Sequence, residues 1–356
     1  MLIQAVVLWS VAFAENHNLS LIPEQDWMPR TVCVLPIIDA LRSAEFHLGY
    51  SWKTHSVLQE KFIQFLREHP EPLHAAFNRS EHNYLISDDA DEANHFIAKK
   101  GFAIELPQHP ESSLYFVSNV YISLLWPRKF QPLLDTAQNG VQYRFAKNTD
   151  DFVVWHTPAS HKYPIFRMRS ASGDEVYVTK ADRPRSNFDL YFYIENILSP
   201  VTDGRQKMLH SGVLKFPCVN IDEICQSIKW LMGFSCNNYS IVEALQRVQF
   251  SLSEVGIQTE SSIVQEKPAL HSLNRQDEWA YIVDEPFFIW IQRKGVPYIL
   301  FAAYCDYDCW RTDDPGEKEC DEMLQPLRSI AAQASCDISQ LPPGLFDMGL
   351  LFGDHE

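Results

Sequence analysis

The sequence of 356 residues predicts an α+β fold with a largely antiparallel system of sheets. Stretches with helical spacing of apolar residues and stretches with alternating residues both occur, but they do not follow a βαβα order. In addition, residues 286–304 predict a hairpin of two apolar strands about a turn at Lys294-Gly295, with Pro286 at the start of the first strand. We therefore expect helices packed on sheets of mainly antiparallel strands.

Three stretches predict helices. Residues 35–49 and 56–69 have apolar residues at helical spacing, and Gly49 stands where the first helix would end. Residues 220–233 begin with Asn220 and Glu223 at the spacing of a capping box and end in a glycine, with apolar residues along one face. We expect a third helix there.

Three other stretches predict strands. Residues 112–122 form an apolar, β-prone run that is typical of the middle of a sheet. Residues 187–195 alternate, and residues 248–253 alternate as well, with Phe250 between Val248 and Leu252 on one face. After Gly256 the sequence turns polar and loses its periodicity until about residue 277. We expect a long loop over this interval.

The charge of the chain excludes two classes of partner. Its 46 acidic residues exceed its 30 Lys and Arg residues, which gives a formal net charge of -16. Nucleic-acid phosphates and anionic membranes would repel such a chain, so neither is an expected partner. No stretch after the first residues is long and apolar enough to span a bilayer.

The N-terminal residues predict a secretory signal peptide over 1–14. Residues 2–14 are apolar, Ala12-Phe13-Ala14 fits a cleavage site between small residues, and polar residues follow at once. The segment lacks a basic region, and the alternatives are a buried N-terminal helix or a short membrane anchor. The signal peptide places the mature protein in the extracellular space.

Secretion makes glycans and disulfides expected features. Sequons occur at Asn18, Asn78 and Asn238. The eight cysteines allow 105 pairings, so the sequence cannot choose among them. Four of them lie late in the chain and are expected to staple its end: Cys305, Cys309, Cys320 and Cys336. From about Trp310 the sequence becomes acidic and turn-rich, so residues 310–356 are expected to form a C-terminal extension.

The sequence contains no constellation that indicates an enzyme. The motifs G-x-S-x-G, H-E-x-x-H, G-x-G-x-x-G and the P-loop are all missing, and glycines number only 13. Residues 69–74, 88–92 and 306–314 combine His or acidic residues, but a loop, a helix start and an imperfect calcium-loop pattern explain them without a ligand. We expect no metal and no cofactor.

Two stretches match motifs of a known family closely in spacing. In residues 35–54, Pro36, Gly49 and Thr54 fit S-P-x-S-I followed by L-G-A-x-x-x-T without a gap. In the stretch that starts at Ser118, the aromatic residues fit N-A-x-Y-F-K-G-x-W-x-x-x-F, with Ser118 at the place of the Asn. The aromatic residues that keep this spacing are Tyr121, Trp126 and Phe130.

Two later stretches complete the pattern. Residues 253–262 resemble E-E-G-T-E-A-A-A-A, and residues 283–304 resemble A-D-R-P-F-L-F-x-I-R followed by G-x-x-L-F-x-G, with Pro286 and Phe287 in place. In this order, the four stretches resemble the serpin family of secreted protease inhibitors over about residues 35–304.

The resemblance implies a serpin-like domain over residues 15–309, with a large, mainly antiparallel central sheet, further sheets and packed helices. It also implies that the loop after residue 256 is bait for an extracellular serine protease. In inhibitory members the cut loop inserts as a new strand into the main sheet and carries the protease with it. The chain is then expected to be a monomer and not an enzyme.

The expected hinge of this loop consists of Glu254, Gly256, Ile257 and Glu260. Insertion requires small or apolar side chains at alternate positions. Ile257 stands where the family has a small Thr or Ser, and Glu260 replaces an alanine. A glutamate that enters a sheet interior without a partner is strongly unfavourable, so the hinge makes insertion doubtful.

Other departures point in the same direction. Leu35 and Ile38 replace the small serines of the sheet-opening region. The distance from residues 101–106 to residues 112–118 leaves no room for the helix that normally lies across the main sheet of the family. Residues 195–214 are also too few for the usual pair of helices. The chain resembles a trimmed serpin.

Two bonds are candidates for attack. Counting forward from Gly256 reaches Leu270-His271, which suits a chymotrypsin-like enzyme, and counting back from Pro286 reaches Arg275-Gln276. Arg275 is favoured and suits a trypsin-like enzyme with an acidic specificity pocket. The alternative function is a non-inhibitory scaffold that acts as an extracellular binding or carrier protein; a secreted enzyme is a third, less favoured possibility.

We predict that the chain is secreted and glycosylated, because the cleavage site precedes three sequons. Mass spectrometry of the secreted protein should show a chain that begins at Glu15 and carries glycan. Retention of Met1, or unmodified asparagine at all three sequons, would contradict the prediction.

Overall fold

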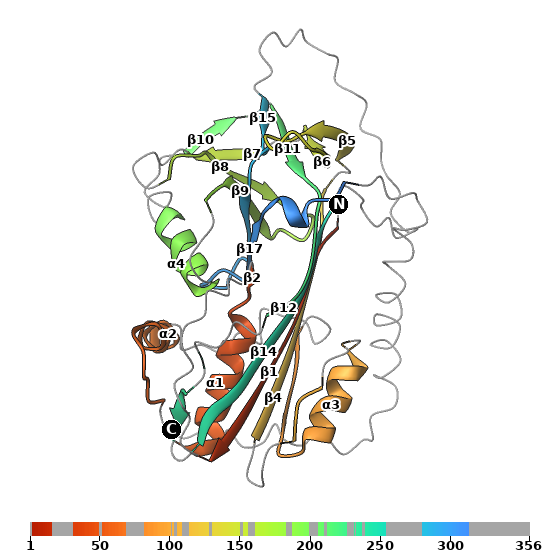
Figure 1. Cartoon of the computed structure of the whole chain (residues 1–356). Coiled ribbons are helices and arrows are strands. Elements are labelled where there is room, and N and C mark those ends of the chain that lie inside the picture. The colour runs from red at the N-terminus through yellow and green to blue at the C-terminus, as the bar shows by residue number, and fades with distance from the viewer. Residues whose placement is uncertain are drawn as a thin grey trace. The chain divides into compact units, whose positions relative to one another are not determined.

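The computed structural model in Figure 1 divides into two compact units, Met1–Asp314 and Pro315–Glu356, and all described residues lie in the first. The described residues are 2–15, 31–49, 52–68, 82–100, 102, 105–108, 114–127, 130–149, 152–155, 161–182, 187–198, 206–209, 212–225, 231, 233–236, 239–253 and 280–312.

The first sheet contains six strands among the described residues, and all of its pairs are antiparallel. Long strands lie side by side in its middle (Figure 1). The order is β12 (Val219–Cys225), β14 (Tyr239–Leu252), β1 (Leu2–Glu15), β4 (Leu114–Leu125) and β3 (His82–Ser87), and β13 (Ser235–Cys236) also pairs with β14.

Two further sheets complete the β-structure. The second sheet has the order β10 (Gln206–Leu209), β7 (Phe152–Trp155), β8 (Ile165–Arg169), β9 (Glu175–Lys180), β16 (Phe287–Gln292), β17 (Phe301–Cys305) and β2 (Thr31–Val32). The third has the order β15 (Ala280–Ile282), β11 (Val213–Pro217), β6 (Gln142–Asn148) and β5 (Gln131–Thr136). The one parallel pair among the described strands joins β11 and β15.

The helices confirm the predicted α+β class. They are α1 (Leu35–Leu48), α2 (Val57–Glu68), α3 (Ala90–Lys99) and α4 (Asn187–Leu198), with a short 3-10 helix at Tyr307–Cys309. Both helices expected in residues 35–69 form, and Gly49 ends α1 with φ 68°, a conformation that favours glycine. Helices α1 and α3 lie on opposite sides of the long strands (Figure 1).

In the full-length chain, the N-terminal segment forms strand β1 in the interior of the first sheet. It pairs with β4 along one edge and with β14 along the other. The buried N-terminal helix that we considered as an alternative is not present in these residues. The reason is compositional, since the uncharged run of residues 2–14, with three Val residues and the aromatic Trp9 and Phe13, satisfies the requirements of a strand inside a sheet.

The strand predicted over residues 187–195 is wrong, because these residues form helix α4. Tyr191, Ile194 and Ile197 are buried at intervals of three, which is the spacing of one helix face. The ring of Tyr191 contacts Phe65 of α2 at 5.3 Å between centroids. Apolar residues at every second position also include pairs four apart, so the alternation seen here is compatible with a helix face.

The helix predicted over residues 220–233 is wrong in its first half, where β12 pairs with β14 over its whole length. Val219 and Ile221 are buried two residues apart, whereas Asp222 is exposed. The pairing with β14 gives the backbone its hydrogen bonds and overrides the local capping signal of Asn220 and Glu223. Residues 226–230 lie outside the described residues.

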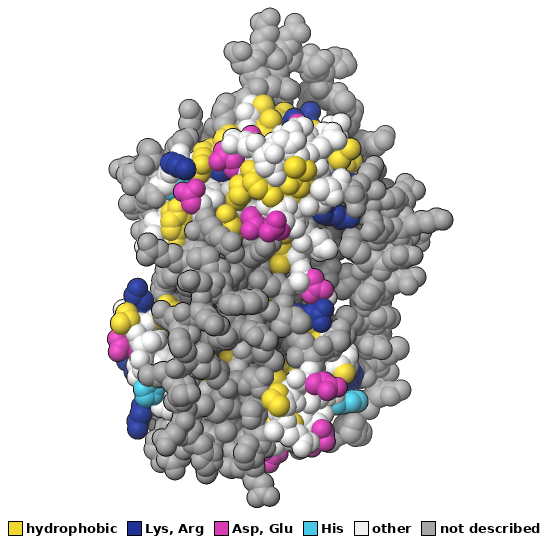
Figure 2. Space-filling view, viewed as in Figure 1, with side chains coloured by type: hydrophobic (Ala, Val, Ile, Leu, Met, Phe, Trp, Pro, Cys, Tyr) yellow, Lys and Arg dark blue, Asp and Glu magenta, His cyan; other side chains and the backbone are white. Residues whose placement is uncertain are grey.

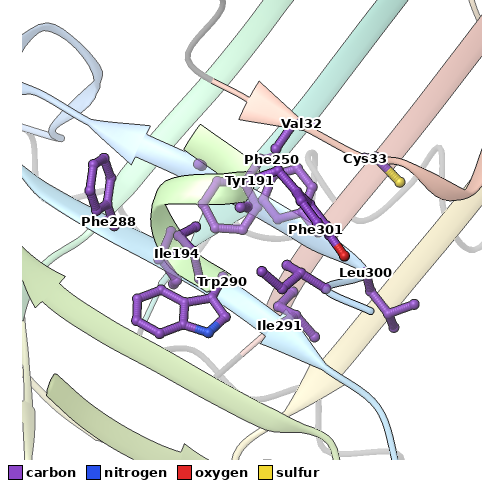
Figure 3. Packing of buried hydrophobic residues seen from close by; sticks show 14 of the residues in the cluster. Val32, Cys33, Tyr191, Ile194, Phe250, Phe288, Trp290, Ile291, Leu300 and Phe301 are labelled. Carbon is purple, nitrogen blue, oxygen red and sulfur yellow. The ribbon is translucent and has the colours of Figure 1, made fainter. Parts of the chain in front are cut away.

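The other predicted strands are confirmed, and they build the core. Strand β4 covers the predicted run, β14 contains residues 248–252, and β16 pairs with β17 as the expected hairpin. Gly295 has φ 87° in the turn, and the second strand begins only at Phe301. Figure 3 shows Phe250 of the first sheet beside Phe301 of the second, and their ring centroids are 4.8 Å apart.

The expected disulfide staple is not present among the described cysteines. Cys33, Cys218, Cys236, Cys305 and Cys309 are all buried as thiols. Burial raises the pKa of Cys33 and of Cys218 to about 12, which keeps both protonated. Cys320 and Cys336 lie outside the described residues.

The C-terminal end of the described region belongs to the core. Trp310, expected at the start of the extension, is buried and contacts the ring of Tyr143 at 5.1 Å between centroids. The core therefore includes this residue, and any extension begins after it.

None of the described helices has the length and apolar character that a bilayer span requires.

We predict that His161 makes the fold sensitive to mild acid. Its Nε2 lies 2.7 Å from the Thr179 hydroxyl and its Nδ1 3.1 Å from the Tyr193 hydroxyl, which joins β9 to α4. Burial lowers the pKa of His161 below its ordinary value. The unfolded chain then takes up the proton more readily, so the free energy of unfolding should fall as the pH drops through about 6.5.

Urea denaturation between pH 7.5 and 5 measures this effect. The difference between the unaltered chain and His161→Gln should shrink or reverse towards pH 5, because the glutamine carries no such acid penalty. A difference that stays constant over this range would contradict the prediction.

Candidate functional site

The expected hinge and both candidate bonds fall between β14 and β15, outside the described residues. They are Glu254, Gly256, Ile257, Glu260, Leu270, His271, Arg275 and Gln276. The three sequon asparagines also lie outside the described residues. The candidate site is therefore built from the two strands that hold residues 254–279 at either end.

The first anchor is the interior strand β14. Leu252, its last residue, lies opposite Ile3 of β1 and opposite Val219 of β12. Val248, Phe250 and Leu252 are fully buried, as the alternation predicted. A strand paired on both edges and packed on its core face is held firmly, so the chain leaves the first sheet from a fixed point.

A polar contact reinforces this anchor on the other face. The Arg247 guanidinium donates to both carboxylate oxygens of Asp222 on β12, each at 3.2 Å, and the Gln249 amide donates to the same carboxylate at 3.3 Å. Asp222 is half exposed, so this ion pair contributes little to the free energy of folding. It does hold the two strands in register next to the exit point.

The second anchor is the edge strand β15 of the third sheet. It runs parallel to β11, with Ala280 opposite Val213, and the Val283 N–H donates to the Lys215 carbonyl at 2.9 Å. Residues 254–279 therefore connect an interior strand of one sheet to an edge strand of another. Such a connection has fixed ends, whatever its own conformation.

Just after β15, a buried lysine holds two carboxylates. Lys180 of β9 donates from its Nζ to Asp284 and to Glu285, the latter at 3.3 Å. Glu285 also accepts from the Tyr163 hydroxyl at 3.2 Å and from the Gln138 amide at 2.8 Å. Lys180 is only 8% exposed. The ion pairs of this cluster therefore connect the second sheet, through a buried side chain, to the segment that follows β15.

Tyr281 of β15 takes part in the same cluster. The Lys180 Nζ lies 5.3 Å from the centroid of its ring, and Phe166 of β8 packs against the ring at 4.6 Å. Burial raises the pKa of Tyr281, and the neighbouring Asp284 and Glu285 raise it further, so the phenol stays neutral.

A second lysine fixes the third sheet itself. Lys215 of β11 donates to Asp135 of β5 at 2.9 Å, and this hydrogen bond lowers the pKa of the Asp135 carboxyl. The pair is more exposed than the Lys180 cluster, with 23% and 31% of the two side chains accessible.

A buried polar cluster links α1 to the first sheet, and sequence analysis missed it. The Nε2 of His82 on β3 lies 2.8 Å from Asp39 of α1 and 3.2 Å from the Ser118 hydroxyl on β4. Leu35 and Ile38, which replace serines of the family pattern, are buried in the same helix. No sequence signal joins these residues, because only the pairing of β3 with β4 brings His82 and Ser118 together.

The described residues contain no group of side chains that could hold a metal ion. No cluster of three or more His, Cys, Asp or Glu side chains with that geometry occurs among them. Figure 2 shows acidic and basic side chains scattered among each other over the described part of the face in view.

Comparisons with known proteins find similarity in structure alone. No family model matches the sequence, and no curated protein matches it. Among solved structures, the chain is similar to thyroxine-binding globulin in complex with thyroxine, with 13% identity and a TM-score of 0.48 over 77% of this chain and 91% of that one. Uncleaved ovalbumin gives 13% identity and a TM-score of 0.48 over 77% and 92%.

An insect protein gives a similar result. Serpin48, a highly specific serpin of Tenebrio molitor, has 12% identity and a TM-score of 0.43 over 77% of this chain and 90% of that one. The TM-scores of these solved structures all lie below 0.5. At these scores they assign neither a function nor a residue's role to this chain.

We predict that Lys180 stabilises the second anchor far more than Lys215 stabilises the third sheet. Lys180→Met leaves two neighbouring carboxylates without their cation and should lower the free energy of unfolding by about 2 kcal/mol. Lys215→Met is the matched control and should cost about 1 kcal/mol or less, because its pair is solvated. Urea denaturation at pH 7 measures both, and equal losses would contradict the prediction.

Proposed function

We propose that this chain is a secreted protein of serpin type that offers residues 254–279 to an extracellular serine protease. The observation that carries the proposal is the way the segment is held. It leaves an interior strand of the large sheet at Leu252 and returns at Ala280 to the edge of another sheet. The four family-like stretches lie in the order expected for such a protein. We also propose that the mature protein is a monomer, that it carries glycans, and that its signal peptide has been removed.

The chemistry would come from the protease. Its serine attacks the carbonyl carbon of Arg275, or of Leu270 for a chymotrypsin-like enzyme, and the bond to the next residue breaks as that residue leaves with a free amine. An acyl-enzyme remains on the N-terminal side of the cut. Inhibition requires that this side enters the sheet before water hydrolyses the ester.

Insertion is expected to be slow in this chain. Ile257 and Glu260 are poorly suited to a closing sheet, and Leu35 and Ile38 place bulky apolar side chains where the family has serines. Both α1 residues are buried, Leu35 at 1% exposure and Ile38 at 0%, so any rearrangement of the sheet over α1 must disturb a packed core. A slow loop behaves as a substrate.

A non-inhibitory binding or carrier protein is the second candidate function. The buried Leu35 and Ile38 favour it, because they oppose the rearrangement of the sheet over α1 that insertion of a loop would require.

We predict cleavage with little covalent complex when the purified protein is mixed with trypsin or chymotrypsin. Gel electrophoresis in SDS and mass spectrometry should find cuts after Arg275 or Leu270 and only a small fraction of protease bound. Arg275→Ala should abolish the trypsin cut and spare the chymotrypsin cut, and Leu270→Ala should do the reverse.

Two results would contradict the proposal in different ways. Near-stoichiometric covalent trapping would show that the hinge inserts fast in spite of Ile257 and Glu260. Resistance of residues 254–279 to both enzymes would contradict the bait function and favour the carrier function.

A further inference from the structure

The outer face of the first sheet carries a small hydrophobic cluster that, among the described residues, is separate from the main core. Helix α3 covers this face on the side of the long strands opposite α1 (Figure 1). Its central members come from α3, from the chain after α3 and from β4: Ala93, Ile97, Phe102, Leu106, Tyr115 and Val117. Strand β4 also contributes Phe116 and Val120 to the main core. Loss of the small cluster would therefore leave the main core closed.

A short stretch of chain, residues 105–108, lies over this cluster, and we call it the strap. Leu106 is 3% exposed and packs in the cluster, whereas Glu105 and Pro107 on either side of it are exposed. The strap belongs to the interval that is too short for the helix expected across the main sheet. One apolar side chain of the strap thus takes part in covering the outer face.

The side chain of Asn94 in α3 fastens the strap by its backbone. The Asn94 Nδ2 donates to the Leu106 carbonyl at 3.0 Å, and the Asn94 Oδ1 accepts from the Leu106 N–H at 2.7 Å. The amide therefore serves both backbone groups of one residue, as a neighbouring strand would. The Tyr115 hydroxyl adds a hydrogen bond to the Pro107 carbonyl at 3.2 Å.

The other features of this region do not tie it to the main core. The Gln108 amide donates to Asp91 at 3.5 Å, but this pair is exposed, so it stabilises the strap little. Helix α3 caps its own start, because the Asp89 side chain accepts from the Asp91 N–H at 2.8 Å. A unit with a small apolar cluster and few buried hydrogen bonds is of the kind that opens without global unfolding.

We propose that the strap and α3 form a unit that opens on its own and uncovers the outer face of β4, with the Asn94 amide as its fastening. In the closed state Tyr115 is 2% exposed and Val117 is 0% exposed. In the open state both side chains face water while the main core stays closed. The unit is a local switch between a covered and an uncovered apolar face, and it does not depend on the proposed function.

Thiol labelling of the full chain under native conditions tests the inference. Ala93→Cys introduces a thiol into the small cluster, and Ala44→Cys introduces one into the main core; both alanines are helical and 0% exposed. Neither α1 nor α3 contains a native cysteine, so digestion and mass spectrometry can follow each position after treatment with iodoacetamide. Position 93 should react at least about a hundredfold faster than position 44, because local opening is more frequent than global unfolding.

A second substitution tests the fastening. Asn94→Leu removes both hydrogen bonds to Leu106 and should speed the reaction at position 93 at least about tenfold, without changing the reaction at position 44. Asn139→Leu is the matched control, because Asn139 also makes two hydrogen bonds, with the Val141 N–H and the Tyr143 hydroxyl, but near the turn between β5 and β6. It should leave the reaction at position 93 unchanged.

Equal rates at positions 93 and 44 would overturn the proposal, because α3 would then open only with the whole chain. A rate at position 93 that Asn94→Leu does not change would overturn the fastening by the amide. Hydrogen exchange of the unaltered chain gives a readout that needs no variant to fold. The amides of α3 should exchange faster than those of β16, and equal protection of both would also overturn the proposal.

Discussion

Backbone pairing at the centre of the first sheet is the constraint on which the described structure depends. A strand inside a sheet must find hydrogen-bond partners for both of its edges, since buried N–H and C=O groups without partners are strongly unfavourable. β4 and β14 meet this condition on their outer edges through β3 and β12, and on their inner edges only through β1. The covering helices and the exit point at Leu252 are positioned by strands that this pairing holds together.

The two ends of residues 254–279 are fixed by different forces. At Leu252 the chain is held by backbone pairing and by apolar packing, which extends to the second sheet through Phe250 and Phe301. At Ala280 it joins an edge strand of three residues, and the stronger hold comes after it, where Lys180 binds Asp284 and Glu285. The first end resists change through cooperativity, whereas the second depends on a few polar contacts that single substitutions can remove.

Local periodicity predicted those elements whose pattern fits one structure only. α1 and α2 have a helical stripe, and β14 alternates from Val248 to Leu252. The failures have specific causes. Residues 187–195 place apolar side chains at intervals that suit a helix face as well as a strand, and the capping signal at Asn220 yields to pairing with a neighbouring strand. The apolar run at the N-terminus has no period that could have identified β1.

The polar parts of the site depend on contacts between distant segments, so the sequence could not predict them. Lys180 and Asp284 are 104 residues apart, and His82 and Ser118 meet only because β3 pairs with β4. The residues that the sequence did nominate, from Glu254 to Gln276, lie outside the described residues and stay predictions. The anchors around them are what the structure adds.

The composition of residues 2–15 suits an interior strand as well as the leader that the sequence predicts. A leader needs an uncharged apolar stretch, and a basic residue before it is common, yet no Lys or Arg occurs between Leu2 and Glu15. The pairing of β1 explains this departure. Leu2 and Ile3 lie opposite Leu125 and Leu124, and Ile3 also lies opposite Leu252, which is itself fully buried. Position 3 lies between the buried Leu124 and Leu252, so a cation there would have to enter an apolar sheet interior without a partner, and the strand excludes at this position a charge that a leader alone would tolerate.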